Sequence, residues 1–137
     1  KHIMSTTKDT KHSCFTMANV APQAGYFNQH PWNELESDVF DWIKENDAVY
    51  IITGVAYKNR QDPSWTYDRI AVPDYYWKVM CNPKNQQAVG FWGHNEDGHG
   101  DECKEKRTVE DVERIYGGKL LPEKYCRKDY VDKAYWW

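Results

Sequence analysis

Three runs of β-branched and aromatic residues constrain the fold of this chain more than any other feature of its sequence. They cover residues 48–57, residues 69–82 with a break at Pro73, and residues 86–94. Runs of this length and composition are typical of strands, and the connections between them favour antiparallel pairing. The sequence therefore predicts an antiparallel sheet. With helices on either side of these runs in the sequence, the predicted class is α+β.

A helix is predicted before the first strand, within residues 27–46. Successive residues of a helix are about 100° apart around its axis. On that spacing one stripe is apolar, formed by Trp32, Leu35, Val39, Trp42 and Ile43. Three acids are predicted to point away from it, namely Asp38, Asp41 and Glu45. Pro31 fits only the first turn of a helix, so the helix is expected to start near Asn28.

Asn28 and Glu36 are the two polar residues of this segment that face its apolar side. An inward carboxylate is costly unless it is paired, hydrogen-bonded or close to a metal. Asparagine at a helix start is commonly a cap, and an inward glutamate is commonly an ion-pair partner. The same two oxygen donors would also suit a hard cation such as Mg2+, which keeps several of its waters. The residues alone leave both interpretations open.

The rest of the chain is expected to complete one domain over residues 1–137. A polar surface loop is predicted around residues 93–107, and a short helix follows, with Thr108 as its cap and Gly117 just past its end. No repeat or interdomain linker divides the 137 residues. Three aromatic residues at the C-terminus need either a groove or a partner, namely Tyr135, Trp136 and Trp137.

Composition and cysteine content limit the partners and the compartment. A net charge of −3 gives no general attraction to nucleic acid or acidic lipid, so polyanion binding would need a local patch or a bound cation. No apolar run reaches the length of a membrane span, and the amino end carries no signal segment.

Wide cysteine spacing suits two disulfides in a secreted protein, with buried cytosolic thiols as the alternative. The cysteines are Cys14, Cys81, Cys103 and Cys126, and three pairings are possible.

Residues 15–36, FTMANVAPQAGYFNQHPWNELE, resemble the signature of the DNA/RNA non-specific endonucleases, a family of the ββα-metal class. The family pattern is an aromatic strand ending in Asn, then P-Q, an N-Q pair, a Trp and L-E. Its positions here are Asn19, Pro22, Gln23, Asn28, Gln29, Trp32, Leu35 and Glu36. Residues 50–57, 68–81 and 109–123 are similar to later parts of the family's domain. The resemblance implies a ββα-metal nuclease fold with an antiparallel sheet and flanking helices, lacking the usual N-terminal strands.

The resemblance also implies which residues act. In the family a catalytic histidine ends a D-R-G-H motif upstream of the signature; His2 is the candidate, with His12 as the alternative. Asn28 would bind the metal, which is Mg2+ or, in its place, Mn2+ or Ca2+. Glu36 would accept hydrogen bonds from the waters of the metal or orient the base. Asn19 would tie the loop before the helix to the strand.

Nucleic acid, both DNA and RNA, is the expected substrate, held by its backbone because the chemistry does not depend on the base. The expected phosphate contacts are Lys8, Lys11, Lys58, Arg60 and Arg69, with the KEKR run at 104–107 as a weaker candidate. A solvated surface charge is the ordinary role for any one of them. The expected location is secreted, and no membrane partner is expected.

The sequence departs from the family pattern at its amino end. Lys1 stands where the motif has Gly, and the Asp-Arg pair and the upstream strands with their catalytic Arg are absent from this sequence. We therefore expect the chain to be a processed product. In that case an N-terminal fragment of the same precursor would complete the edge of the sheet. In a truncated relative that cleaves nothing, the edge would instead be capped, charged or used to form a homo-oligomer. The alternative function is a catalytically inactive, nuclease-like secreted protein with a binding or structural role.

Overall fold

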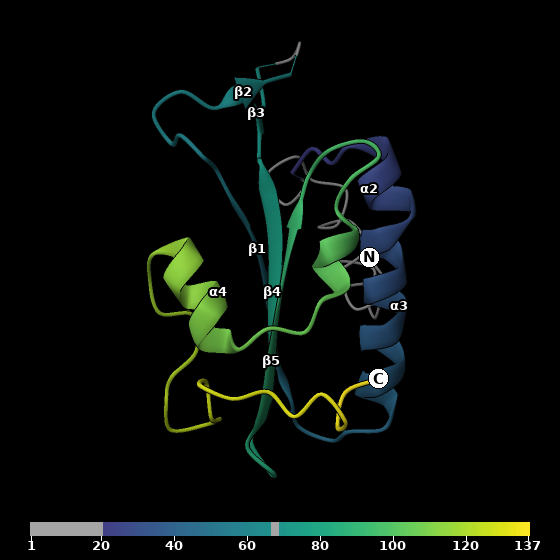
Figure 1. Ribbon diagram of the computed structural model, residues 1–137, viewed down its shortest axis with the longest axis vertical. Helices are drawn as coiled ribbons and strands as arrows, with labels where there is room; N and C mark the ends of the chain where they lie inside the picture. The colour runs from purple at the N-terminus through teal and green to yellow at the C-terminus, as the bar shows by residue number, and fades with distance from the viewer. Residues whose placement is uncertain (1–20, 67–68) are drawn as a thin grey trace, which may run out of the picture.

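The computed structural model describes residues 21–66 and 69–137. Three helices, a 3-10 helix and five strands are described there (Figure 1). In chain order they are α2 Gly25–Gln29, α3 Pro31–Lys44, β1 Tyr50–Ala56, β2 Ser64–Trp65, β3 Ala71–Val72, β4 Tyr75–Asn82, β5 Gln87–His94, the 3-10 helix η2 Asp101–Lys104 and α4 Val109–Tyr116.

The main sheet is antiparallel, with strand order β1-β4-β5. The register runs from Tyr50 opposite Cys81 to Ala56 opposite Tyr75 in the first pair, and from Tyr75 opposite His94 onward in the second. The three predicted runs therefore form the three strands, and Pro73 marks the predicted break before β4. A small second sheet, in which β2 pairs with β3, was not predicted.

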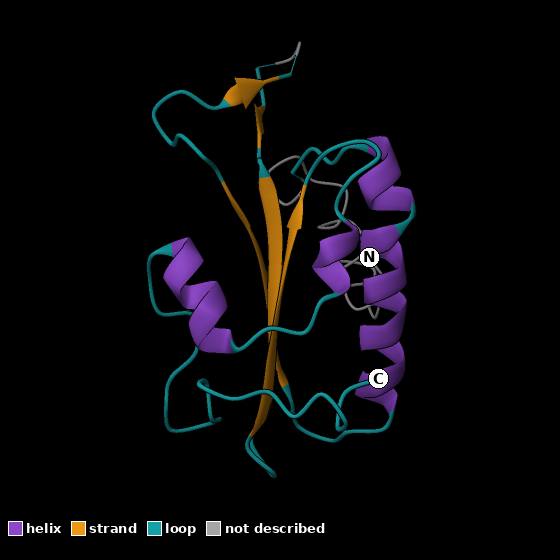
Figure 2. Ribbon diagram, viewed as in Figure 1, coloured by secondary structure: helices purple, strands orange, loops and turns teal. Residues whose placement is uncertain are grey.

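Helices cover both faces of the main sheet (Figure 2). α2, α3 and η2 lie on one face, and α4 lies on the other. Because side chains alternate along a strand, β4 contributes to two cores. Tyr76 and Met80 pack with the buried stripe of α3, whereas Trp77 and Val79 pack with Val112 of α4. The mixed α+β class with an antiparallel sheet is thus confirmed.

The apolar stripe of α3 is buried as predicted. Trp32, Leu35, Val39 and Trp42 are buried, and Ile43 packs against them while partly exposed. Asp38, which was predicted to point away from this stripe, is half-buried, and the charged groups near it include Lys104 and Lys106. Burial, reinforced by the nearby acids Asp41 and Glu34, raises the pKa of Asp38.

The expected start of the helix near Asn28 is wrong. The segment contains two helices, α2 and α3, with His30 between them at φ −114° and ψ −94°. Proline disfavours helical backbone at the residue before it, and its own nitrogen has no hydrogen to donate. The break at His30 follows from Pro31, which begins α3. Asn28 therefore belongs to the short helix that precedes α3.

The polar segment after β5 is more structured than predicted. It contains η2, whose Cys103 is buried against the α3 side of the core. The helix that follows agrees with its predicted ends. Thr108 caps α4 by accepting a hydrogen bond from the Asp111 amide at 3.0 Å. Gly117 ends α4 with φ +88°, a conformation that favours glycine.

One disulfide is described, between Cys81 on β4 and Cys126 in the C-terminal segment. The prediction of two disulfides fails at Cys103, which is a free and fully buried thiol. Burial, reinforced by the Glu102 carboxylate, raises the pKa of Cys103 to about 12. Cys14 lies outside the described residues. The disulfide is consistent with an oxidising compartment.

The terminal aromatic residues pack against this chain itself. The Trp136 ring lies 4.9 Å from the Trp42 ring of α3, measured between centroids, and Trp136 is 3% exposed. The Trp137 ring stacks on Phe91 at 5.9 Å. The groove that these residues require is therefore provided by α3 and β5, although Trp137 remains 40% exposed.

A nearly buried ion pair ties α4 to the C-terminal segment. The Lys128 ammonium donates to both carboxylate oxygens of Glu113, at 2.8 and 2.9 Å, and the two side chains are 8% and 12% exposed. Partial burial acts to raise the pKa of Glu113. The hydrogen bonds from Lys128 and from the Leu120 amide outweigh it and hold that pKa below its ordinary value.

Glu113→Gln is expected to lower the free energy of unfolding by about 3 kcal/mol near neutral pH, because it leaves a buried ammonium unpaired. In the native protein the stability linked to the lowered pKa of Glu113 is fully present above its unfolded pKa, near 4.5. The contribution is lost as the pH falls through the lower folded pKa. Urea unfolding over this pH range should show a flatter acid limb in the variant. Glu110→Gln, at an exposed position on the same helix, is the matched control; equal stability of the two variants would contradict the prediction.

Candidate functional site

Asn28 lies on α2 with an exposed side chain. It caps neither helix, since the N-cap positions of α2 and α3 are Ala24 and His30, and neither makes a side-chain cap hydrogen bond. Among the described residues, no hydrogen bond to its carboxamide is recorded. The cap interpretation of Asn28 is therefore excluded, and no described residue is recorded as a partner of its side-chain oxygen.

Two glycines allow α2 to dock closely on the sheet. Phe27, the residue before Asn28, is fully buried. A Cβ atom at Gly93 or Gly100 would collide with the Phe27 ring, and Gly100 also has φ +96°, where glycine is favoured. The absence of side chains at Gly93 and Gly100 thus leaves room for the Phe27 ring. With Phe27 buried, the next residue, Asn28, lies on the exposed side of α2.

Asn95, just after β5, anchors the start of α2 to the sheet. Its side-chain oxygen accepts a hydrogen bond from the Ala24 amide at 2.6 Å. Its side-chain nitrogen donates to the Pro22 and Pro73 carbonyls at 3.0 and 2.8 Å. A second anchor is the Asp97 carboxylate, which accepts from the Tyr26 amide at 2.8 Å. Asn95 was not singled out in the sequence, and it is a positioning residue for α2.

Glu36 is half-buried on α3, on the side that faces β4. Its charge acts on two β4 residues, Tyr76 and Lys78. No ion pair with Glu36 is recorded among the described residues. The prediction that Glu36 turns inward is therefore consistent with the structure, and no described arginine neutralises it.

Lys78 is the unexpected member of this cluster, since it is only 3% exposed. Its ammonium donates to the Thr53 hydroxyl at 2.6 Å and lies 5.2 Å from the centroid of the Trp32 ring. Burial lowers the pKa of Lys78, while the Glu36 carboxylate acts in the opposite direction. The only signal in the sequence was a lysine within an otherwise apolar strand.

Tyr76 closes the cluster on the side toward α2. Its hydroxyl donates to the Ala21 carbonyl at 2.8 Å. Burial raises its pKa, and the nearby Tyr57 and Glu36 raise it further. The phenol therefore stays protonated near neutral pH and acts as a hydrogen-bond donor that holds the segment before α2.

Asn28 on α2 and Glu36 on α3 are the candidate ligands for a hydrated hard cation. Asn28 offers an exposed amide oxygen and Glu36 a half-buried carboxylate, and both are hard oxygen ligands. Mg2+ usually keeps several waters and takes only one or two protein ligands, with substrate phosphate completing its shell. In the part of the chain that is described, no group of three His, Cys, Asp or Glu side chains could hold a metal. A cation at this end of the chain would therefore depend on Asn28 and Glu36, between which no contact is recorded among the described residues.

The other predicted site residues are described only in part. His2, His12, Asn19, Lys8 and Lys11 lie outside the described residues. Lys58 and Arg60 line a cavity on the α4 side of the sheet, together with residues of α4. Arg69 is exposed in the turn between β2 and β3.

Two cations of the 104–107 run are already engaged with carboxylates. Lys104 pairs with Glu34 at 2.5 Å, and Arg107 lies 3.4 Å from Asp111. Nearby, His94 at the end of β5 pairs with Glu102 of η2, and this hydrogen bond helps to lower the pKa of Glu102 against the effect of burial. Lys104, Arg107 and His94 therefore each pair with a carboxylate within this chain.

The family model described as DNA/RNA non-specific endonuclease matches residues 2–128. The chain belongs to this family. Members of this family are nucleases. The matched residues include Asn28 of α2 and Glu36 of α3.

Two curated relatives are similar over part of the chain. A salivary endonuclease of Lutzomyia longipalpis is 30% identical over 98 residues, which cover 66% of this chain and 24% of the relative. The mitochondrial endonuclease G of Homo sapiens is 31% identical over 75 residues, covering 48% of this chain and 25% of the relative. The chain therefore aligns with about a quarter of the length of each.

A solved structure supports the fold. The crystal structure of an EndoG/EndoGI complex contains a chain that this one matches with a TM-score of 0.68 and 23% identity, over 89% of this chain and 57% of that one. This likeness confirms the predicted nuclease fold. In residues 21–66 and 69–137, no helix has the length and hydropathy to cross a membrane.

Proposed function

We propose that this chain is part of a secreted, Mg2+-dependent endonuclease that hydrolyses phosphodiester bonds in DNA and RNA. The observation that carries the proposal is the pair of oxygen donors on α2 and α3, where Asn28 is exposed without a capping role and Glu36 turns toward the sheet. Family membership supports the nuclease class. The Cys81–Cys126 disulfide and the salivary origin named for one relative support secretion.

The proposed roles follow from phosphodiester chemistry. Asn28 and Glu36 would hold the divalent cation, which when bound would polarise the phosphate and stabilise charge on the leaving 3′ oxygen. Glu36 would accept hydrogen bonds from water in the site and fix its orientation. His2, as a neutral imidazole, would take the proton of the attacking water. Asn19 would tie the loop before α2 to the preceding strand.

The electrostatic interactions of Glu36 with Tyr76 and Lys78 of β4 support its proposed role. A carboxylate that orients water must be charged and held in place. Lys78 supplies an opposite charge from β4, and the ammonium is itself fixed by Thr53 and Trp32. Lys78 would thus be a positioning residue that acts through Glu36.

Incubation of the purified protein with plasmid DNA and with RNA tests the proposal. Cleavage of both substrates with Mg2+, and none with a chelator, is the expected result. The same assay decides between the enzyme and a nuclease-like protein with a binding or structural role. Intact substrates after long incubation at high protein concentration with Mg2+ would contradict nuclease activity of this chain.

A further inference from the structure

Two adjoining cavities form a groove on the α4 side of the sheet, which we call the Arg60 groove. Their volumes are about 490 and 840 Å³, and both are lined by Ala56, Tyr57, Arg60 and Tyr116. The larger cavity is lined by Ile115 and Tyr116 of α4. Figure 2 shows α4 on the opposite face of the sheet from α2 and α3, which carry Asn28 and Glu36. Neither Asn28 nor Glu36 lines the groove.

Cationic side chains line the larger cavity. They are Lys58, Arg60 and Arg107, with His94 beside them, and no carboxylate belongs to its lining. Arg107 is partly neutralised by Asp111 and Glu105, at 3.4 and 3.7 Å. Among the described residues, neither Lys58 nor Arg60 forms an ion pair. The groove therefore holds unneutralised positive charge in a chain whose net charge is −3.

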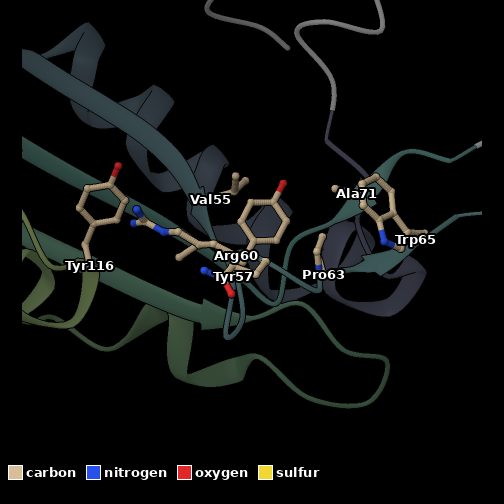
Figure 3. Close-up of a pocket in the computed structure, with 9 residues that line it drawn as sticks. Val55, Tyr57, Arg60, Pro63, Trp65, Ala71 and Tyr116 are labelled. Atoms are coloured by element: carbon tan, nitrogen blue, oxygen red, sulfur yellow. The ribbon is translucent and has the colours of Figure 1, made fainter.

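Both of these cations lie over aromatic rings. The Lys58 ammonium is 5.8 Å from the centroid of the Tyr75 ring, and the Arg60 guanidinium is 5.8 Å from that of Tyr116. Figure 3 shows Arg60 reaching toward Tyr116. Cation–π contacts of this kind hold a long side chain in place while leaving its charge available to an anion.

Aromatic side chains line the smaller cavity. Tyr57 and Tyr116 flank Arg60, and Trp65 stands at the far end beside Pro63 and Ala71 (Figure 3). Trp65 is 59% exposed, the largest exposure among the large hydrophobic residues described. An indole ring at the mouth of a cavity that also holds an unpaired guanidinium suits a ligand with both flat rings and negative charges.

We propose that the Arg60 groove binds a single-stranded segment of nucleic acid, with Lys58 and Arg60 on its phosphates and Trp65 and Tyr57 stacked on its bases. Proteins that bind single strands combine a cationic track with aromatic platforms. The groove offers both within one concave surface. The choice of ligand rests on the proposed nuclease function, but the site is separate from Asn28 and Glu36. It is a second contact surface for the substrate.

Fluorescence anisotropy with a labelled oligothymidylate of about a dozen nucleotides tests the groove, a length within the range of known single-strand sites. A chelator is present throughout, so that binding is measured without cleavage. The test variant is Lys58→Gln/Arg60→Gln, and the matched control is Lys84→Gln/Lys119→Gln, which removes the same charge at exposed positions outside the groove. Urea unfolding checks that both variants keep the fold.

The test variant should bind at least about tenfold more weakly at about 0.1 M salt, and the slope of log K against log salt should fall by about 1.4, or about 0.7 for each lost phosphate contact. Trp65→Ala should weaken binding about tenfold with an unchanged slope, because stacking carries no charge. The control should bind like the native protein.

Three results would contradict the proposal that the Arg60 groove binds single-stranded nucleic acid. They are no binding by the native protein, equal binding by the test and control variants, and binding of thymidine monophosphate as tight as that of the oligonucleotide, which would indicate a free-nucleotide pocket. Failure of the nuclease proposal looks different. In that case the plasmid and RNA stay intact with Mg2+, while the anisotropy differences between the variants remain.

Discussion

Replacing Asn28 with alanine is expected to reduce Mg2+-dependent cleavage of DNA and RNA by more than about a hundredfold. Loss of a residue that only supports a metal ligand already costs about 10–100-fold, and Asn28 is proposed to be a ligand itself. Because Asn28 is exposed and caps no helix, the free energy of unfolding should change by less than about 0.5 kcal/mol. Initial cleavage rates and urea unfolding measure the two effects separately.

Two further variants make this result specific. Asn33→Ala makes the same chemical change at an exposed position of α3 and should keep the native rate. Asn28→Asp retains an oxygen donor and should cleave faster than Asn28→Ala. Native activity in Asn28→Ala would remove Asn28 from the site. Equal losses in the Asn28 and Asn33 variants would assign the effect to the helices rather than to a ligand.

Removing the disulfide should produce the largest loss of stability. Cys81 and Cys126 are 45 residues apart, and a crosslink over that separation stabilises a fold by about 4 kcal/mol in the chain-entropy account. Domains are commonly stable by about 5–15 kcal/mol. Cys81→Ala/Cys126→Ala should therefore lose a large part of the free energy of unfolding. Urea unfolding under oxidising conditions measures this loss.

Reduction provides the control for this variant. A reductant should lower the stability of the native protein toward that of the double variant and leave the variant itself unchanged. Cys103 forms no disulfide, so its thiol should not contribute to the difference. A double variant as stable as the oxidised native protein would contradict the prediction. Further destabilisation of the variant by reductant would indicate a second disulfide.

Features encoded by local patterns were predictable from the sequence. The three strands follow from runs of β-branched and aromatic residues, and the buried stripe of α3 follows from helical spacing. Thr108 and Gly117 marked the ends of α4 because a cap and a positive φ each require particular residue types. The break between α2 and α3 does not follow from the spacing of the apolar stripe. Its signal is Pro31, which begins α3 and also disfavours helical backbone at His30.

Features that depend on distant segments were not predictable. Asn95 acts as an anchor only because Ala24, Pro22 and Pro73 bring backbone groups to it. Lys78 is tolerated inside the core because Thr53 and Trp32 come from other elements. The placement of Lys58 and Arg60 depends on the side of the sheet to which the chain turns after β1, which no spacing in the sequence reveals. The sequence therefore predicted Lys58 and Arg60 only as phosphate contacts, and the structure adds that they line the Arg60 groove.

We propose that Asn28 and Glu36 together hold one divalent cation. Paramagnetic broadening of backbone amide signals by substoichiometric Mn2+ tests it most directly, because the broadening falls steeply with distance from the ion. We expect the broadened signals to centre on α2 and the first turns of α3, and the effect to vanish in Asn28→Ala/Glu36→Gln. Broadening centred on the acidic residues 96–102, or unchanged in that double variant, would contradict the claim.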